Sequence, residues 1–175
     1  MGSVHLITGP PGVGKTSLLL ALLERLPGSK GGFYTREIRD GRQRVGFQVN
    51  DLAGHEGVLA HVNLPGPPRV GRYGVDLEAF DAIGVRAVSR ALQGADLIVI
   101  DEIGKMELYS PLFQKVLFEV LESARPLLGT IMAQPHPVAD RIKAHPDVRV
   151  KQLTQTNRQE VAQLLWADIS LLLAR

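Results

Sequence analysis

The sequence contains no cysteine, and this absence excludes disulfide bonds, thiolate metal ligands and cysteine nucleophiles. It also has no apolar run near the roughly 18 residues that are needed to cross a bilayer. Its first residues lack the positively charged start and the long apolar middle of a signal peptide. We therefore expect a soluble, cytoplasmic protein with no membrane segment.

An excess of one charge is also missing, because 20 Lys and Arg residues face 18 Asp and Glu residues. The net charge of +2 is far from the concentrated positive charge of a dedicated nucleic-acid-binding protein. An anionic ligand must therefore be held by a local site. What the sequence does have is 175 residues, 45% of them hydrophobic, which is enough for one domain with a sizeable core. We predict a single domain over residues 1–175.

Short apolar strands alternate with helical patterns along the chain. This alternation predicts an α/β fold in three layers, in which helices cover both faces of a mostly parallel sheet. The predicted strands cover 4–7, 97–100, 126–133 and 148–153. The predicted helices begin near Lys15, at Pro111 and near Asn157, lie within 136–146, and cover 76–94 with a break near Gly84.

Two stretches lie outside this alternation. Residues 32–38 and 44–50 are rich in strand-forming residues and flank the pair Asp40-Gly41, which predicts an antiparallel hairpin. The stretch "NLPGPPRVGRYG", residues 63–74, has so much proline and glycine that we expect a long irregular loop there.

Two helix starts carry capping signals. Ser110 precedes Pro111, a residue that suits the first turn of a helix, so Ser110 is expected to cap that turn. Thr156 and Gln159 have the spacing of a capping box for the final helix. Side-chain caps are therefore predicted at both starts.

Residues 9–16, "GPPGVGKT", match the phosphate-loop pattern G-x-x-x-x-G-K-[ST] and lie between a predicted strand and a predicted helix. Gly12 and Gly14 let backbone N–H groups approach phosphate oxygens, and the helix start adds its positive dipole end. A glycine turn with an accidental lysine is the alternative. The residues predicted to bind the nucleotide here are Gly9, Pro10, Pro11, Gly12, Val13, Gly14, Lys15, Thr16 and Ser17.

Within this loop the pattern assigns separate roles to neighbouring residues. Lys15 is expected to reach the β- and γ-phosphates, and the Thr16 hydroxyl is expected to bind Mg²⁺. Asp101 follows a buried apolar strand and is placed to hold the same ion through water. For Asp101 the alternative is an acid that caps the turn after its strand.

Glu102 directly follows the predicted metal-binding Asp101. A carboxylate in this place can orient and deprotonate a water molecule for attack on the γ-phosphate, so the pair favours hydrolysis. Nucleotide kinases can also carry a second acid near this point, and that alternative stays open.

Four further residues are candidates on weaker grounds. Arg72 and Lys105 are cations that could stabilise charge on the transferred phosphoryl group, with a structural salt bridge as the alternative for each. Asn157 and Arg158 follow the last strand and are predicted to flank the nucleotide base, with ordinary helix-start chemistry as the alternative. The hairpin arginines could touch nucleic acid, but a solvated charged hairpin is the favoured interpretation.

Four stretches in this order, "GPPGVGKTSLL", "GFYTREIRDGRQRVGF", "VGRYGVDLEAF" and "IDEIGKMEL", together resemble the small nucleoside-triphosphatase family of thermophile enzymes and the human cancer-related nucleoside triphosphatase. The resemblance extends to "TNRQEV" in the last helix. It implies Mg²⁺-dependent hydrolysis of ATP, GTP and other nucleoside triphosphates to diphosphates, with weak base selectivity. It also implies a sheet of order 5-1-4-3-2 and the catalytic role for Glu102.

One departure from the family concerns the end of the predicted strand 126–133. Where members carry threonine and histidine, this chain has Thr130 followed by "IMAQPHP". Gln134 and His136 are therefore both candidates for contact with the γ-phosphate.

Two other functions compete with hydrolysis. A nucleoside or nucleotide kinase needs an arginine-rich lid, and the segment 133–147 offers only Arg141 and Lys143, which counts against it. The other is a nucleotide-gated binding module that acts on RNA or a partner protein through slow hydrolysis.

Overall fold

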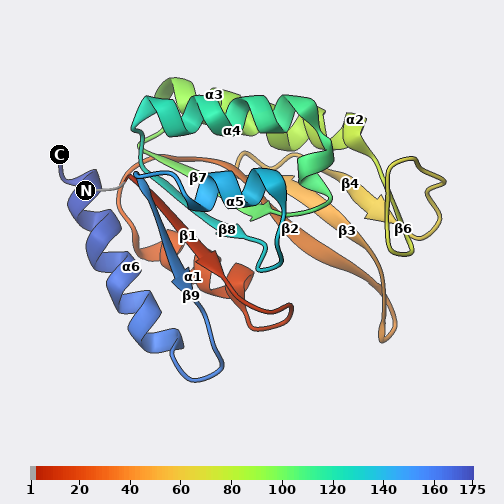
Figure 1. Ribbon diagram of the computed structural model, residues 1–175, viewed down its shortest axis with the longest axis horizontal. Coiled ribbons are helices and arrows are strands. Elements are labelled where there is room, and N and C mark those ends of the chain that lie inside the picture. The colour runs from red at the N-terminus through yellow and green to blue at the C-terminus, as the bar shows by residue number, and fades with distance from the viewer. Residues whose placement is uncertain (1–2) are drawn as a thin grey trace.

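The computed structural model describes residues 3–175 and shows one mixed sheet with helices on both faces (Figure 1). Its strands are β1 (Val4–Thr8), β2 (Lys30–Asp40), β3 (Gln43–Asp51), β4 (Glu56–His61), β5 (Arg69–Val70), β6 (Tyr73–Val75), β7 (Leu97–Ile103), β8 (Leu127–Ile131) and β9 (Val148–Gln152). They lie in the order β5-β6-β4-β3-β2-β7-β8-β1-β9. Pairing is parallel from β2 through to β9 and antiparallel from β2 outward to β5.

The order of the nine-stranded sheet differs from the prediction, which gave a mostly parallel sheet of order 5-1-4-3-2 with an added antiparallel hairpin. In the structure the hairpin does not stand apart, because β3, β4, β6 and β5 continue the same sheet beyond β2. Inside the parallel part, β9, β1, β8, β7 and β2 follow one another as neighbours, which is the order 5-1-4-3-2 when these five strands are numbered along the chain. The three-layer α/β architecture itself is confirmed.

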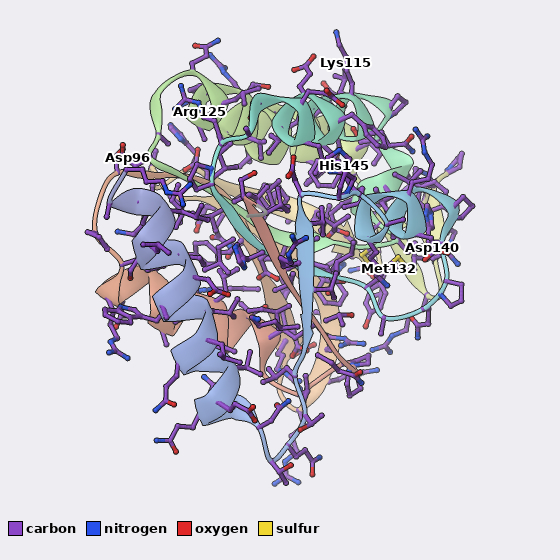
Figure 2. All side chains as sticks on the ribbon, turned by 60° about the vertical axis from the view of Figure 1, so that its left-hand side comes forward. Asp96, Lys115, Arg125, Met132, Asp140 and His145 are labelled. Carbon is purple, nitrogen blue, oxygen red and sulfur yellow. The ribbon has the colours of Figure 1, made fainter. Side chains whose placement is uncertain are left out.

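Helices form the two outer layers. They are α1 (Lys15–Arg25), α2 (Leu77–Phe80), the π-helical η1 (Asp81–Val85), α3 (Arg86–Gly94), the 3-10 turn η2 (Glu107–Tyr109), α4 (Pro111–Ser123), α5 (Pro137–Lys143) and α6 (Arg158–Leu173). Charged side chains such as Lys115 point away from the layers, whereas Met132 lies beneath α5 (Figure 2). Over residues 3–175, no helix has both the length and the apolarity that a membrane span requires.

Two apolar clusters fill the space between the sheet and its helix layers, because alternate residues of a strand point to opposite faces. In β7, Ile98 and Ile100 belong to the cluster that contains α3 and α4 side chains. Leu97 and Val99 belong to the cluster that contains α1 and α6 side chains. Burial on both faces explains the apolar run of this strand and places Asp101 near its carboxyl end.

The predicted hairpin is confirmed as β2 and β3. The chain turns at Gly41, whose φ of +61° is a left-handed value that glycine adopts without side-chain strain. β4 pairs with β3 and is a strand that the sequence pattern did not indicate.

The prediction of an irregular loop over 63–74 is wrong in part, because β5 and most of β6 lie within it. Glycine has a packing role here. A Cβ at Gly74 would lie 2.1 Å from the carbonyl oxygen of Leu64, so only glycine allows the two backbones to pass so closely. Composition alone does not distinguish this role from a loop.

The predicted break near Gly84 is a π-helical segment, and the chain passes from α2 through η1 into α3 without leaving helical geometry. A Cβ at Gly84 would lie 2.8 Å from the Phe80 ring, so this glycine makes room for an aromatic side chain. It does not end the helix.

The two capping predictions differ in outcome. Ser110 is the N-cap of α4, and its Oγ accepts a hydrogen bond of 3.0 Å from Phe113 N, as predicted. The Thr156–Gln159 capping box is wrong, because α6 begins at Arg158 and no side chain caps it. Asn157 Oδ1 instead accepts from Thr154 N, which closes the turn before the helix.

The Ser110 cap leads to a stability prediction. Ser110→Ala removes the acceptor for a buried N–H, so we expect the free energy of unfolding in urea to fall by about 1 kcal/mol or more. Ser89→Ala, in the middle of α3, is the matched control and should change it by less than half as much. Equal effects of the two substitutions would contradict the capping role.

Candidate active site

The loop between β1 and α1 is shaped by glycines at left-handed backbone angles. Gly12 and Gly14 have φ values of +79° and +101°, and Gly14 is the N-cap of α1. A Cβ at Gly9 would lie 2.7 Å from the carbonyl oxygen of Leu153, so this glycine lets the loop pack against the chain that follows β9. No side chain caps α1. Its first N–H groups are therefore free to bind an anion.

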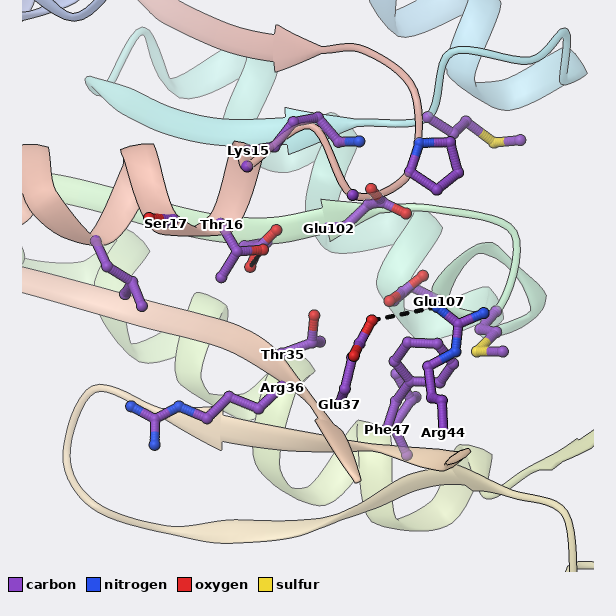
Figure 3. Close-up of a pocket in the computed structure, with 18 of the residues that line it drawn as sticks. Lys15, Thr16, Ser17, Thr35, Arg36, Glu37, Arg44, Phe47, Glu102 and Glu107 are labelled. Atoms are coloured by element: carbon purple, nitrogen blue, oxygen red, sulfur yellow. Dashed lines mark hydrogen bonds and ion pairs between the residues drawn. The ribbon is translucent and has the colours of Figure 1, made fainter. Parts of the chain in front are cut away.

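Lys15 is the first residue of α1 and its side chain folds back over the loop. Its Nζ donates to the carbonyl oxygens of Gly9 at 2.8 Å and Pro10 at 3.2 Å. Figure 3 shows the lysine end lying above the Glu102 carboxylate, on the same side of the sheet. The ammonium group is thus held where the loop and an acidic strand end face each other.

Asp101 is the centre of the hydrogen bonds below the loop. Its carboxylate accepts a hydrogen bond of 2.8 Å from Thr16 Oγ1, at the start of α1, and one of 2.6 Å from Thr130 Oγ1, on β8. The side chain is only 2% exposed. Burial raises the pKa of this carboxyl above its ordinary value, and the two hydroxyl groups oppose that rise by stabilising the charged form.

Glu102 lines the cavity that opens next to the loop. Burial raises the pKa of its carboxyl, the charge of Lys15 acts in the opposite direction, and the neighbouring Asp101 raises it further. A carboxylate with a raised pKa is a better proton acceptor than one in water. The arrangement thus has the chemistry of a general base beside a group of phosphate-binding donors.

The cavity has a volume of about 880 Å³ and brings together most of the predicted site. The predicted residues in its lining are Pro11, Gly12, Gly14, Lys15, Thr16, Ser17, Asp101, Glu102, Lys105 and Gln134. Gly9 and Pro10 instead line a second cavity of about 590 Å³, which they share with Pro11 and Gln134. Val13 packs against the apolar cluster of α1 and α6.

Arg72 and His136 are outside the lining of the large cavity and make structural contacts. Arg72 donates to the carbonyl oxygen of Arg44 and lies 5.3 Å from the centre of the Tyr73 ring. His136 caps α5, where its Nδ1 accepts a hydrogen bond of 3.2 Å from Val138 N. Gln134 and His136 both follow β8 and were both predicted candidates for contact with the γ-phosphate. Of the two, Gln134 lines the large cavity.

Arg158 and Asn157 differ in where their side chains go. Arg158 donates a hydrogen bond of 3.1 Å to the carbonyl oxygen of Gly14 and one of 3.2 Å to Ser17 Oγ. These bonds connect α6 to the loop and to the first turn of α1. Asn157 Nδ2 donates a hydrogen bond of 2.8 Å to the carbonyl oxygen of Gln152, and Asn157 Oδ1 accepts one from Thr154 N. Its amide is therefore committed to the turn before α6.

The sequence reasoning missed several residues of the cavity wall. Thr35, Glu37 and Arg44 come from the hairpin, and Glu107 comes from the turn after β7. Glu37 binds Arg44 at 3.2 Å across the hairpin, as the dashed line in Figure 3 shows. Glu107 lies within the stretch "IDEIGKMEL", but nothing in its spacing indicated that it would line the cavity.

A family model described as NTPase matches residues 4–165 of this chain. The chain belongs to the NTPase family. Among relatives of this NTPase, the nucleoside-triphosphatase THEP1 of Thermotoga maritima is 46% identical over 156 residues and covers 89% of each chain. The protein of the same name from Thermofilum pendens is 42% identical and covers 97% of each chain.

Solved structures agree with this assignment. The crystal structure of THEP1 from Aquifex aeolicus matches with a TM-score of 0.87 at 30% identity, covering 95% of this chain and 99% of that one. The solution structure of a human cancer-related nucleoside triphosphatase matches with a TM-score of 0.79 at 36% identity, covering 98% of each chain. The predicted family resemblance is confirmed, and this NTPase-family chain is an enzyme of the nucleoside-triphosphatase class.

The contacts of Arg158 in this NTPase lead to a local prediction. Arg158→Gln shortens the side chain and removes its contacts with Gly14 and Ser17. We expect faster amide hydrogen exchange in the loop and first turn of α1, by about tenfold. Arg149→Gln, which loses only contacts with Pro146 and Val148, is the control and should leave these amides unchanged. Unaltered exchange in the Arg158 variant would show that the loop holds its own shape.

Proposed function

We propose that this chain hydrolyses nucleoside 5'-triphosphates, ATP and GTP among them, to the diphosphate and phosphate in a Mg²⁺-dependent reaction with low base selectivity. One observation carries the proposal: a phosphate loop at a helix N-terminus and two adjacent acids, Asp101 and Glu102, line one cavity. The first part binds a polyphosphate, and the second part suits a metal ion and an attacking water.

The polyphosphate is held by the loop backbone. The N–H groups of Gly12, Gly14, Lys15 and Thr16 and the positive end of the α1 dipole attract the β- and γ-phosphates. Lys15 adds a full positive charge at the same place. Because these donors are fixed by the fold before the nucleotide arrives, little reorganisation is needed when charge builds up in the transition state.

The residues of this site fit a magnesium ion. Thr16 Oγ1 and Asp101 Oδ2 are hard oxygen ligands that already lie 2.8 Å apart, and the buried Asp101 carboxylate has no ion pair with a cation among residues 3–175. These two side chains are the ones that would hold the ion. When bound, Mg²⁺ supplies positive charge to the phosphate oxygens.

Glu102 acts as the general base. It accepts a proton from water as the water oxygen bonds to the γ-phosphorus and the bond from that phosphorus to the bridging oxygen breaks. Lys15 and Lys105 stabilise the charge that develops, and both line the cavity together with Glu102. Gln134 lies in the same lining and can donate a hydrogen bond to the γ-phosphate.

Low base selectivity follows from the residues near the start of α6. The Asn157 amide is already paired on both sides with backbone groups, so it has little capacity to read a base edge. Arg158 is fastened to the loop and can contact any base through the flat face of its guanidinium group. Neither contact distinguishes one base from another.

Transfer to an acceptor other than water is not favoured. A kinase lid needs free arginines between β8 and β9, but Arg141 lies 4.7 Å over the Phe118 ring, and Lys143 is the other Lys or Arg residue of that segment. Arg141 is thus packed on α4. The connection therefore offers little charge to close over a transferring phosphoryl group.

The proposed base gives a direct test. Glu102→Gln keeps the size of the side chain but cannot accept the proton, so we expect phosphate release from ATP to fall by about a hundredfold. ATP binding, measured by titration calorimetry, should stay within a few-fold of the parent protein. Glu122→Gln, an exposed change on α4, is the matched control. Turnover of the Glu102 variant near that of the control would refute the assignment.

The reaction class has its own test. Purified protein incubated with ATP, GTP, CTP or UTP alone should release phosphate from all four at rates within about tenfold of one another. Chelation of divalent ions with EDTA should abolish release, and added Mg²⁺ should restore it. Release that begins only when an acceptor molecule is supplied would point to phosphoryl transfer, and release unaffected by EDTA would exclude the metal.

A further inference from the structure

Glu107 is a buried carboxyl group in the wall of the large cavity, and the reaction described above gives it no role. It is the first residue of η2, it lines the cavity together with Glu102, and it is only 5% exposed. Burial of a carboxyl group is costly unless hydrogen bonds or a bound proton compensate for the lost water. The contacts of Glu107 therefore show what this group does beside the proposed base.

The carboxyl groups of Glu102 and Glu107 converge on one glycine. A Cβ at Gly104 would lie 2.5 Å from Glu102 Oε1 and 2.8 Å from Glu107 Oε2, so a side chain at this position would displace both acids. Figure 3 shows the two carboxyl groups at the same end of the cavity. Because both oxygens lie so close to a single point, a direct hydrogen bond or one bridging water molecule is enough to join them.

The two carboxyl groups have different surroundings. Burial raises the pKa of Glu102, but the positive charge of Lys15 acts in the opposite direction. Burial and the nearby charge of Glu102 raise the pKa of Glu107 well above its ordinary value, and only backbone N–H groups, those of Glu107 and Gly104, oppose the rise. Two neighbouring carboxyl groups whose environments separate their pKa values divide into an acid and a base. Glu107 is the member of this pair that keeps its proton.

The cations of the cavity wall do not take the place of that proton. Lys105 and Arg36 line the cavity, but within residues 3–175 neither forms a salt bridge with Glu107. Arg44 binds a different acid, Glu37, at 3.2 Å. A neutral carboxylic acid has an O–H group to donate, and a carboxylate is a strong acceptor. The nearest carboxylate to receive this hydrogen bond is the one that meets Glu107 at Gly104.

We propose that Glu107 is a positioning residue for Glu102: as a neutral acid it donates a hydrogen bond, directly or across one water molecule, that holds the Glu102 carboxylate in the orientation it needs to accept a proton from the attacking water. This inference rests on the proposed role of Glu102 as general base. Side chains that act on a reacting atom lose much of their effect when their geometry is released by even about 1 Å. Loss of the donor therefore slows the chemical step and leaves nucleotide binding unchanged.

Two substitutions of similar size separate the donor from the volume of the side chain. Glu107→Gln retains a neutral donor, so kcat for ATP hydrolysis should stay within about threefold of the parent protein. Glu107→Met fills the same space without a donor, so kcat should fall by about tenfold or more while the Kd for ATP, measured by titration calorimetry, stays the same. Glu122→Met, an exposed change on α4, is the matched control. A Gln variant as slow as the Met variant would overturn the proposal, as would a Met variant as fast as the control.

A double substitution tests whether Glu107 acts through Glu102. If it does, Glu107→Met should slow a protein that already carries Glu102→Gln by less than about twofold, because the group to be positioned no longer acts as a base. A general defect of the fold or of the phosphate loop would instead lower both backgrounds by the same factor. Equal factors in the two backgrounds would therefore exclude a positioning role.

The same set of variants tells failure of this inference from failure of the proposed function. If Glu102→Gln turns over as fast as the parent protein, Glu102 is not the base and Glu107 has nothing to position. If Glu102→Gln is slow and Glu107→Met is as fast as the control, only the role of Glu107 is wrong. If circular dichroism shows that the Met variant does not fold, Glu107→Asp decides in its place. That change withdraws the carboxyl group by one methylene, so the same loss of kcat is expected, and an unchanged kcat would overturn the proposal.

Discussion

Asp101 joins three elements that the chain places far apart. Its carboxylate lies on β7 and accepts hydrogen bonds from Thr16, in the first turn of α1, and from Thr130, on β8. These bonds fix the helix start against the strand ends, so the glycine loop and the strand end that carries Glu102 keep one geometry. Charge-assisted hydrogen bonds inside a protein are stronger than neutral ones, and the surrounding burial makes them hard to replace with water. Glu102 and Lys15 depend on this arrangement for their mutual position.

The same constraint explains why the inner half of the site could be predicted from the sequence. A glycine-rich loop between an apolar strand and a leucine-rich helix has few alternative structures, and a buried strand that ends in two acids must present them at the carboxyl edge of a parallel sheet. The roles of Lys15, Thr16, Asp101 and Glu102 rest on these local patterns. The patterns are strong because backbone geometry and chemistry require the same residues.

The outer half could not be predicted in the same way. β5 and most of β6 lie in a stretch rich in glycine and proline, which normally indicate loops, and here Gly74 is required by a close approach to Leu64 that only the folded chain reveals. Arg72 attracted attention because it is a cation in a glycine-rich stretch, but its side chain is used across the hairpin. Glu107 carried too little signal, since its burial arises from packing among η2, Gly104 and the hairpin, and sequence spacing does not encode such contacts.

One strand connects these two halves. The first residues of β2, Lys30 to Phe33, pair with β7 in the parallel core, and the rest of the strand pairs with β3. Evolution can therefore lengthen, shorten or rewrite the distal hairpin while the proximal four residues keep their register. A scaffold of this kind is suited to diversification, because the hairpin can change while the pairing of β2 with β7 stays the same.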